Sequence, residues 1–421
     1  MLKEREEIMV IQTLTKDENK FLLLEGVHPS AIEILKSAGF TNIEYHKSAL
    51  SPEELKQALK DVRFIGIRSR TQLTKDIIDS APKLAGIGCF CIGTNQVDLD
   101  AATVKGIPVF NAPFSNTRSV AELVLAEAIL LLRRVPDANA KAHRGKWNKI
   151  ATGSHEARGK NLGIIGYGHI GSQLSILAES LGMNVYFYDI ETKLPLGNAK
   201  QVSTMKELLA ISDIVSMHVP ENPTTIKMIS DNEIDAMKQN AILINASRGK
   251  VIDLDALTKA LKANKLSGAA IDVFPTEPAS NNDPFESPLC QFDNVIITPH
   301  IGGSTSEAQE NIGIEVASKL AKYSDTGATL SAVNFPEASL PIPAKGSSRF
   351  INIHRNQPGV LTAINTLFAE QGLNISAQYL QTDPQIGYVV IDIDRVKQSK
   401  AEELLSKLKN VPGTIRARLL F

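Results

Sequence analysis

The segment NLGIIGYGHIG, residues 161–171, carries the strongest structural signal in the chain. Its first half is typical of a buried strand, and Gly166, Gly168 and Gly171 fit the pattern G-x-G-x-x-G. A helical pattern follows, and then a second apolar run that ends at Asp189. In such a unit the first glycine permits a tight turn, the second lets the backbone approach a pyrophosphate, and the third lets helix and strand pack closely. The segment therefore predicts a Rossmann-type nucleotide-binding domain.

Asp189 indicates which dinucleotide this unit binds. A carboxylate at the end of the second strand accepts hydrogen bonds from the adenosine ribose hydroxyls and repels the 2′-phosphate of NADP. The amides at the start of the intervening helix hold the phosphates. We therefore predict NAD as the cofactor. A glycine turn without a ligand is the alternative, but the strand, helix and acid in register disfavour it.

Length and composition limit the other possibilities. With 421 residues the chain is long enough for about three domains. Lys plus Arg number 45 against 46 Asp plus Glu, a balance that disfavours nucleic-acid or polybasic membrane binding. No apolar run approaches the roughly 20 residues that span a bilayer, and the N-terminus lacks the apolar core of a signal peptide. Only three cysteines occur, which predicts a cytoplasmic protein without a disulfide framework or a metal site.

Short apolar runs alternate with helical patterns in two parts of the chain, which predicts parallel sheets covered by helices. The second part begins with a long helix predicted over residues 119–144, and a helical return over residues 305–324 leads the chain back to the first part. We therefore predict an α/β protein in which a Rossmann-type domain, residues 116–303, is inserted in a flavodoxin-like substrate-binding domain, residues 1–115 and 304–336.

The last part of the chain has a different order of elements. A linker rich in Pro, Ser and Ala, residues 334–348, precedes it. The pattern that follows is strand, helix, strand, strand, helix, strand, which is the order of a ferredoxin-like fold. We predict this third domain over residues 347–421.

Three strands of the second part end in side chains that suit catalysis. Arg248 follows AILINAS, Glu277 follows GAAIDVF, and His300 ends NVIITPH. Ligands of open α/β sheets bind beyond the carboxyl ends of the strands, so we expect these side chains in one crevice. Histidine exchanges a proton near neutral pH, a carboxylate orients it, and arginine binds a substrate carboxylate. Each residue alone could be structural, but together they predict a dehydrogenase that oxidises a hydroxyl group.

Two further cations follow a strand of the first part. Arg68 and Arg70 come directly after the apolar run FIGI. As a pair they can neutralise a phosphate group. The alternative interpretation is a pair of solvated surface arginines.

Four segments, GYGHIG, INASRG, DVFPTEP and TPHIGGST, resemble those of the D-isomer-specific 2-hydroxyacid dehydrogenases. The resemblance includes NAPFSNTRSVAE, residues 111–122, and a C-terminal domain similar to an ACT domain. It implies that His300 is the catalytic acid and base, Glu277 its partner and Arg248 the substrate anchor. It also implies that Arg68, Arg70 and Asn116 bind the substrate.

The resemblance further implies a set of contacts with NAD. These come from the glycine turn, the end of the next strand and three later strand ends: Gly166, Gly168, His169, Ile170, Gly171, Asp189, Ala246, Ser247, Arg248, Asp272, His300, Ile301, Gly302 and Gly303.

For family members that end in an ACT domain, the resemblance implies NAD-dependent oxidation of 3-phospho-D-glycerate to 3-phosphooxypyruvate, the first step of L-serine biosynthesis. It implies L-serine as a feedback inhibitor, bound by His354, Asn356 and Asn374 where two ACT domains meet, and a homotetramer. A plain dimerisation module is the alternative, because Asn before Pro-Gly is an ordinary helix-capping pattern.

Two other functions stay open. A related D-2-hydroxyacid dehydrogenase, such as one that reduces 2-oxoglutarate, could use Arg68 and Arg70 for a distal carboxylate. A nucleotide-sensing scaffold or co-repressor could have kept the fold, although the intact catalytic residues disfavour it. Replacement of His300 by Asn separates enzyme from scaffold, because only an enzyme should lose its activity.

Overall fold

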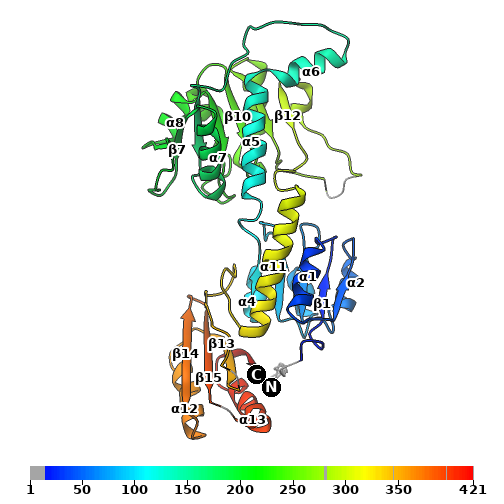
Figure 1. Ribbon diagram of the computed structural model, residues 1–421, viewed down its shortest axis with the longest axis vertical. Helices are drawn as coiled ribbons and strands as arrows, with labels where there is room; N and C mark the ends of the chain where they lie inside the picture. The colour runs from blue at the N-terminus through cyan, green and yellow to red at the C-terminus, as the bar shows by residue number, and fades with distance from the viewer. Residues whose placement is uncertain (1–14, 279–281, 345, 395, 421) are drawn as a thin grey trace, which may run out of the picture. The chain divides into compact units, whose positions relative to one another are not determined.

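The computed structural model describes residues 15–278, 282–344, 346–394 and 396–420. The chain divides into two compact units. The first unit runs to Pro113 and resumes at Gln309, and the second runs from Phe114 to Ala308. The chain therefore leaves the first unit once and returns to it, as the colours of Figure 1 show. The predicted boundaries at residues 116, 303, 336 and 347 stay predictions.

The first unit contains a five-stranded parallel sheet with the order β2-β1-β3-β4-β5. This is the flavodoxin-like order that we predicted. The strands are β1 (Phe21–Leu23), β2 (Ile43–Tyr45), β3 (Phe64–Ile67), β4 (Gly86–Cys89) and β5 (Val109–Phe110). The helices are α1 (Ser30–Ser37), α2 (Pro52–Ala58), α3 (Lys75–Asp79), α4 (Leu99–Val104) and α11 (Ser306–Thr326), of which the greater part lies in this unit.

The sequence analysis missed one strand of this sheet. β2 pairs with β1 at the sheet edge, and all three of its residues are partly exposed. It therefore lacks the apolar run that marks the buried strands. By contrast, α2 begins where the sequence indicates, since Ser51 and Glu54 form a capping box and Pro52 occupies the first helical position.

The second unit contains a seven-stranded parallel sheet with the order β12-β11-β10-β9-β6-β7-β8. Counted from β6, this is the doubly wound Rossmann order, with its switch point between β6 and β9. The strands are β6 (Asn161–Ile165), β7 (Asn184–Tyr188), β8 (Lys200–Gln201), β9 (Ile214–Met217), β10 (Ala241–Asn245), β11 (Leu266–Ile271) and β12 (Val295–Ile297). The helices are α5 (Thr117–Leu132), α6 (Val135–His143), α7 (His169–Ser180), α8 (Met205–Ile211), α9 (Asp231–Ala236) and α10 (Leu254–Lys262), with short 3₁₀ turns η1 (Gly249–Val251) and η2 (Pro288–Gln291).

The predicted single helix over residues 119–144 is wrong. The structure has two helices, α5 and α6, separated at Arg134, whose backbone is left-handed with φ of 55°. Pro136 lies in the first turn of α6 and has no backbone N–H for a continuous helix. Asn116 is the N-cap residue of α5, but its side chain makes no capping hydrogen bond.

The C-terminal part of the first unit is a four-stranded antiparallel sheet with the order β14-β15-β13-β16. Its elements are β13 (Ser348–Arg355), α12 (Val360–Glu370), β14 (Ile375–Thr382), β15 (Ile386–Ile393), α13 (Gln398–Lys409) and β16 (Thr414–Leu420). This order confirms the predicted ferredoxin-like fold. Apolar residues of the two helices, such as Phe368 and Leu404, pack with residues of the strands in one core.

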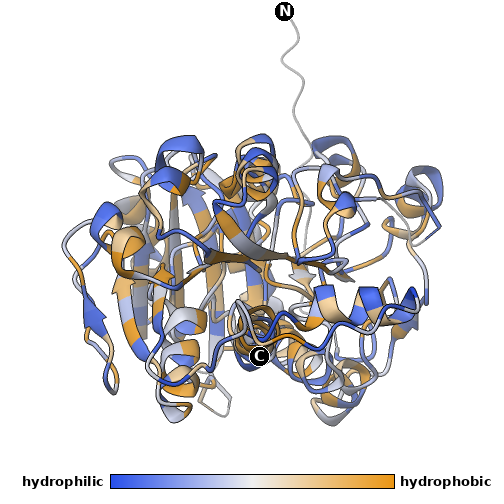
Figure 2. Cartoon of the chain, turned by 90° about the horizontal axis from the view of Figure 1, so that it is seen from above, coloured by the Kyte–Doolittle hydropathy of each residue, from blue (hydrophilic) through white to orange (hydrophobic). Residues whose placement is uncertain are grey.

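Apolar residues, orange in Figure 2, concentrate in the strands and on the inner sides of the helices. One core of the first unit joins its two sheets, because Phe64 of β3 and Tyr323 of α11 belong to the same cluster as Ile351 and Tyr388 of the antiparallel sheet. Among the described residues, no helix is long and apolar enough to cross a membrane, and no group of three or more His, Cys, Asp or Glu could hold a metal ion.

Candidate active site

The glycine turn lies between β6 and α7, at the switch point of the seven-stranded sheet. Gly166 has φ of +92°, and a Cβ there would lie 2.4 Å from the carbonyl oxygen of His218. A Cβ on Gly171 would lie 2.3 Å from the carbonyl oxygen of Gly166. Both positions therefore require glycine. A Cβ on Gly168 would meet no atom within 4 Å, so the backbone there is open to a ligand.

The start of α7 offers backbone donors at this opening. Gly168 is the N-cap residue and has no side chain to satisfy the first amides of the helix. His169 and Ile170, both predicted NAD contacts, lie in that first turn. The His169 ring packs on Phe114, with ring centroids 4.0 Å apart. This cradle fits the pyrophosphate of a dinucleotide, because the N-terminal amides of a helix bind anions.

Asp189 follows β7 and is held by backbone donors. One carboxylate oxygen accepts from the Tyr167 N–H at 2.8 Å, and the other accepts from the Glu191 N–H at 3.1 Å. These bonds fix the carboxylate beside the glycine turn. Each oxygen keeps a second lone pair, so Asp189 can still accept hydrogen bonds from ribose hydroxyls.

His300 and Glu277 form a hydrogen-bonded pair. His300 Nδ1 lies 2.8 Å from Glu277 Oε2, and Glu277 Oε1 accepts from the Phe274 N–H at 3.1 Å. The hydrogen bond to Glu277 raises the pKa of His300, against the effect of partial burial. Burial acts to raise the pKa of Glu277, but the hydrogen bonds from His300 and Phe274 outweigh it, so this pKa is lowered. The pair therefore favours a protonated imidazole beside an ionised carboxylate.

Arg248 lies near the His300–Glu277 pair, on a closely packed loop. A Cβ on Gly249 would lie 2.0 Å from the backbone of Phe274, so the loop after β10 rests directly on the loop that leads to Glu277. The positive charge of Arg248 acts to lower the pKa of both Glu277 and His300. The structure thus brings the three predicted catalytic residues together.

Asn245 holds this loop, although the sequence analysis did not single it out. Its Oδ1 accepts from the N–H and the Oγ–H of Ser247, and its Nδ2 donates to the carbonyl of Arg248. Ala246 and Ser247, both predicted NAD contacts, are only 9% and 8% exposed. The available signal was a polar residue at the end of an otherwise apolar strand.

Asp272 holds the segment that carries His300. It is 1% exposed, and its carboxylate accepts from Thr298 Oγ1 at 2.6 Å, from the Ile301 N–H at 2.8 Å and from the Gly302 N–H at 2.8 Å. Its carbonyl oxygen accepts from the His300 N–H at 2.8 Å. These bonds make Asp272 a positioning residue. Its direct contact with NAD stays a prediction.

Asn116 packs against the same segment. Its side chain is 8% exposed, and its Nδ2 lies 2.4 Å from where a Cβ on Gly303 would be. Among the described residues, its buried Oδ1 has no hydrogen-bond partner. An unsatisfied acceptor beside the His300 segment is consistent with the predicted role in substrate binding.

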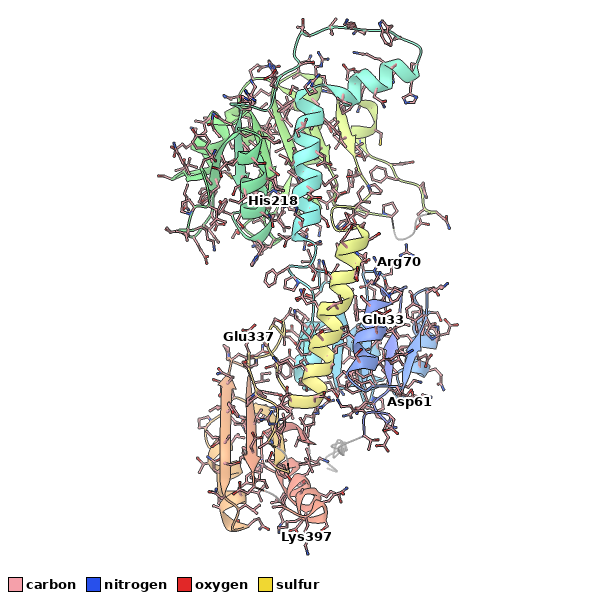
Figure 3. The ribbon with its side chains drawn as sticks, viewed as in Figure 1. Glu33, Asp61, Arg70, His218, Glu337 and Lys397 are labelled. Carbon is pink, nitrogen blue, oxygen red and sulfur yellow. The ribbon has the colours of Figure 1, made fainter. Side chains whose placement is uncertain are left out.

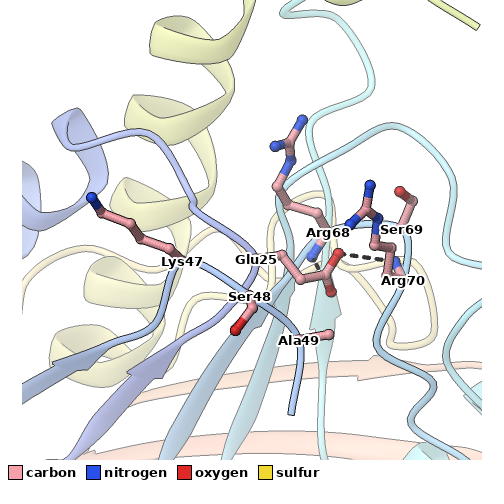
Figure 4. Close-up of a pocket in the computed structure, with 7 residues that line it drawn as sticks. All are labelled: Glu25, Lys47, Ser48, Ala49, Arg68, Ser69 and Arg70. Atoms are coloured by element: carbon pink, nitrogen blue, oxygen red, sulfur yellow. Dashed lines mark hydrogen bonds between the residues drawn. The ribbon is translucent and has the colours of Figure 1, made fainter. Parts of the chain in front are cut away.

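Arg68 and Arg70 line a pocket of about 300 Å³ in the first unit, together with Glu25, Lys47, Ser48, Ala49 and Ser69 (Figure 4). Arg70 is also labelled among the side chains of Figure 3. The Glu25 carboxylate organises the loop, because it accepts from the N–H groups of Arg68 at 3.2 Å, Arg70 at 2.9 Å and Thr71 at 2.9 Å. The pocket therefore presents several cations and suits an anionic group. Sequence reasoning missed Glu25, whose signal is an acid at the end of the apolar run FLLL, residues 21–24.

The three predicted effector residues do not meet within one chain. Ile375 of β14 lies opposite Ile393, whereas Thr382 lies opposite Gly387, which also pairs with His354. Asn374 precedes Ile375, so it lies at the opposite end of the sheet from His354 and its neighbour Asn356.

The environments of these three residues also differ. His354 is 4% exposed, burial lowers its pKa, and its Nδ1 lies 3.0 Å from Asn352 Oδ1. Asn356 Nδ2 donates to the Asp383 carbonyl at 2.6 Å. Asn374 is exposed at the start of β14. Any site that uses all three therefore needs a second chain.

Comparisons with known proteins agree with this geometry. The family model described as D-isomer specific 2-hydroxyacid dehydrogenase, NAD binding domain, matches residues 125–302. The model described as AHAS small subunit-like ACT domain matches residues 350–416. Fold and site thus define an NAD-binding dehydrogenase with a C-terminal ACT domain.

Closely similar sequences narrow this class. The D-3-phosphoglycerate dehydrogenase of Escherichia coli strain K12 is 68% identical over 97% of this chain and 99% of its own length. That of Haemophilus influenzae is 66% identical over the same shares. The chain belongs to the D-3-phosphoglycerate dehydrogenases of the D-isomer-specific 2-hydroxyacid dehydrogenase family. A D-lactate dehydrogenase from Aquifex aeolicus, solved with NAD and lactic acid, is 27% identical with a TM-score of 0.64 over 76% of this chain and all of its own.

Proposed function

We propose that this chain catalyses the NAD-dependent oxidation of 3-phospho-D-glycerate to 3-phosphooxypyruvate, the first step of L-serine biosynthesis. The observation that carries the proposal is the His300–Glu277 hydrogen bond with the charge of Arg248 acting on both residues. Relatives at 68% identity are named for this activity. NAD, held by the glycine turn, Asp189 and the predicted contacts, supplies the hydride acceptor when it is bound.

The protein residues have separate tasks in this proposal. Glu277 is hydrogen-bonded to Nδ1 of His300. The other ring nitrogen, Nε2, is therefore the atom that takes the C2 hydroxyl proton. Arg248 binds the substrate carboxylate with its two-pronged guanidinium group. Arg68 and Arg70 neutralise the phosphate, and Asn116 accepts a hydrogen bond from the substrate. The ordered Glu277 carboxylate stabilises the imidazolium that forms when His300 takes the proton.

We also propose that L-serine is the feedback inhibitor and that it binds between the ACT domains of two chains. Support comes from the ACT match over residues 350–416 and from the positions of His354 and Asn374 at opposite ends of one sheet. We further propose that the protein is a homotetramer and that it is located in the cytoplasm. Sedimentation velocity tests the tetramer, and a dimer or a monomer would contradict it.

The first experiment follows NADH absorbance with purified protein and 3-phosphooxypyruvate, with and without L-serine. We run it in the reducing direction because oxidation of an alcohol by NAD is usually unfavourable at neutral pH. Rapid loss of NADH that L-serine suppresses is the expected result. Turnover of 2-oxoglutarate instead would keep the dehydrogenase chemistry and replace the substrate, since the Arg68 and Arg70 pocket could also bind a distal carboxylate.

A paired variant tests the catalytic role of His300 against a scaffold function. His300→Asn should reduce turnover by about 10²–10⁴-fold, while NADH binding persists. His155→Asn, at an exposed histidine of the same unit, is the matched control and should keep full activity. Full activity in the His300 variant would overturn the assignment.

A further inference from the structure

Three arginines gather where the parallel and antiparallel sheets of the first unit share a core. Arg63 directly precedes β3. Arg416 and Arg418 are two positions apart in β16, so their side chains lie on the same face of that strand. Tyr323 of α11 lies with them, since the Arg418 guanidinium is 4.7 Å from the centroid of its ring. None of these residues belongs to the proposed active site.

These polar groups are buried without enough acceptors. Arg63, Arg418 and Tyr323 are 4%, 3% and 0% exposed. Among the described residues, Arg63 Nε, Arg418 Nη1 and Tyr323 Oη have no hydrogen-bond partner. The acceptors found among the described residues are backbone carbonyls: Arg416 Nη1 donates to Leu84 at 2.6 Å, and Arg418 Nη2 donates to Ser324 at 3.3 Å. Buried donors are normally paired, so unpaired donors from three separate elements indicate a missing acceptor.

The cluster also lacks a counter-charge. Within the part of the chain that the structure describes, no ion pair includes Arg63, Arg416 or Arg418. Burial, with the charges of Arg418 and Arg416, lowers the pKa of Arg63 to about 9. Burial likewise lowers the pKa of Arg416 to about 10. Both pKa values lie above 7, so Arg63 and Arg416 stay positively charged at neutral pH. Like charges are therefore held close together in the protein interior.

Arg349 on β13 provides the contrast within the same unit. Its guanidinium is 0% exposed and donates to both carboxylate oxygens of Asp392, at 2.6 and 2.7 Å. This buried arginine thus has the bidentate acid partner that such a group requires. The three-arginine cluster has no equivalent.

We propose that Arg63, Arg416 and Arg418 form a binding site for a free, phosphate-sized oxyanion. Such an ion would offset most of the charge and accept hydrogen bonds from the unpaired Arg63 Nε, Arg418 Nη1 and Tyr323 Oη. The low exposure of these residues favours a small free ion over a phosphate ester, which would need room for its organic group. The bound ion would link β16 of the ACT domain to Arg63 and α11 of the substrate-binding part.

The test is the thermal stability of the full chain in chloride and in phosphate at equal ionic strength. Without phosphate, Arg63→Gln should melt at the same temperature as the wild type or higher, because it removes one of the repelling charges. With phosphate, the wild type should gain at least about 2 °C more than the variant. Phosphate bound in the Arg68 and Arg70 pocket cancels in this comparison, because both proteins keep that pocket.

Arg355→Gln, at an exposed arginine that ends β13, is the matched control and should respond to phosphate like the wild type. Arg63→Lys keeps the charge and should retain part of the extra gain, which guards against a variant that simply misfolds. Equal phosphate gains in the wild type and Arg63→Gln would overturn the proposal. A differential gain with glycerol phosphate but not with inorganic phosphate would overturn the assignment to a free ion.

Discussion

His300 adopts a left-handed backbone conformation, with φ of 54°. Residues other than glycine are uncommon in this region, and the surrounding structure must stabilise them. Here Asp272 does so, since its carboxylate and carbonyl bind the segment from Thr298 to Gly302. The direction of the imidazole therefore depends on one buried acid as well as on Glu277.

Replacement of Glu277 by Gln should change the pH dependence of turnover. The hydrogen bond to Glu277 raises the pKa of His300, and the reducing direction needs His300 protonated. Activity therefore falls as the pH rises through this pKa, and the fall should come at lower pH in the variant. The measurement is kcat/KM for 3-phosphooxypyruvate against pH. Glu286→Gln, at an exposed acid nine residues further along the chain, is the control, and identical profiles for all three proteins would contradict the role of Glu277.

Glu127 on α5 is the buried acid without an evident function. It is 2% exposed, and neither of its oxygens has a partner among the described residues. Burial, with the nearby charge of Asp272, raises its pKa to about 8. The folded protein therefore binds this proton more tightly than the unfolded chain, so stability should decrease as the pH rises from about 4.5 to 8.

Glu127→Leu should remove that decrease. Relative to the wild type, the free energy of unfolding of the variant should rise by about 4 kcal/mol from pH 5 to pH 9. Urea unfolding at the two pH values measures the difference. Glu122→Leu, at an exposed acid of the same helix, is the control. A wild type and Glu127 variant with the same pH dependence would show that Glu127 does not titrate as described.

At the scale of elements, the turn from β6 to α7 contains glycines that are needed for two different reasons. Gly166 and Gly171 are required by the protein itself, because a Cβ there would collide with backbone oxygens at 2.4 and 2.3 Å. The protein itself does not require glycine at position 168, because a Cβ there would meet nothing within 4 Å. We predict that the bound ligand requires it. Sequence spacing predicts all three positions but cannot separate these reasons.

Alanine variants at the first two glycines of the turn should separate them experimentally. Gly168→Ala should fold with an unchanged melting temperature and bind NADH at least about tenfold more weakly, because its methyl group stands where the pyrophosphate approaches. Gly166→Ala should instead lower the melting temperature. Calorimetric binding and thermal unfolding measure the two effects. A Gly168 variant that binds NADH normally would contradict the assignment of this turn as the pyrophosphate-binding site.

The elements that the sequence analysis missed have physical reasons. β2 is a partly exposed edge strand without an apolar run. The interruption at Arg134 depends on a left-handed residue two positions before Pro136, within a pattern that otherwise resembles one long helix. Hydrophobic periodicity marks the buried faces of elements. β2 has no fully buried residue, and periodicity does not report the left-handed backbone of Arg134.

At the scale of the whole molecule, the ACT domain offers only parts of a serine site. His354 and Asn356 lie at one end of the antiparallel sheet and Asn374 lies at the other. The proposed site must therefore combine Asn356 of one chain with Asn374 of another. Two variants that each lack one of these residues should complement each other.

Asn356→Ala and Asn374→Ala homo-oligomers should each lose most inhibition by L-serine. In mixed oligomers, one of the two sites at an interface between unlike chains contains both wild-type residues, so inhibition should partly return. The measurement is NADH oxidation against L-serine concentration after co-refolding or co-expression. Mixtures that stay as insensitive as the parents would contradict a site shared between chains.

Local patterns were sufficient for the fold class and the cofactor, because periodicity and glycine spacing are properties of short segments. The same strand ends predict the catalytic roles of Arg248, Glu277 and His300. Only the tertiary structure shows that Asn245 holds the Arg248 loop, that Asp272 holds the His300 segment and that Glu25 holds the Arg68 loop. It alone also brings Arg63 to Arg418 across more than three hundred residues. These contacts join distant parts of the chain, and their partners become defined only when burial makes an unpaired polar group costly.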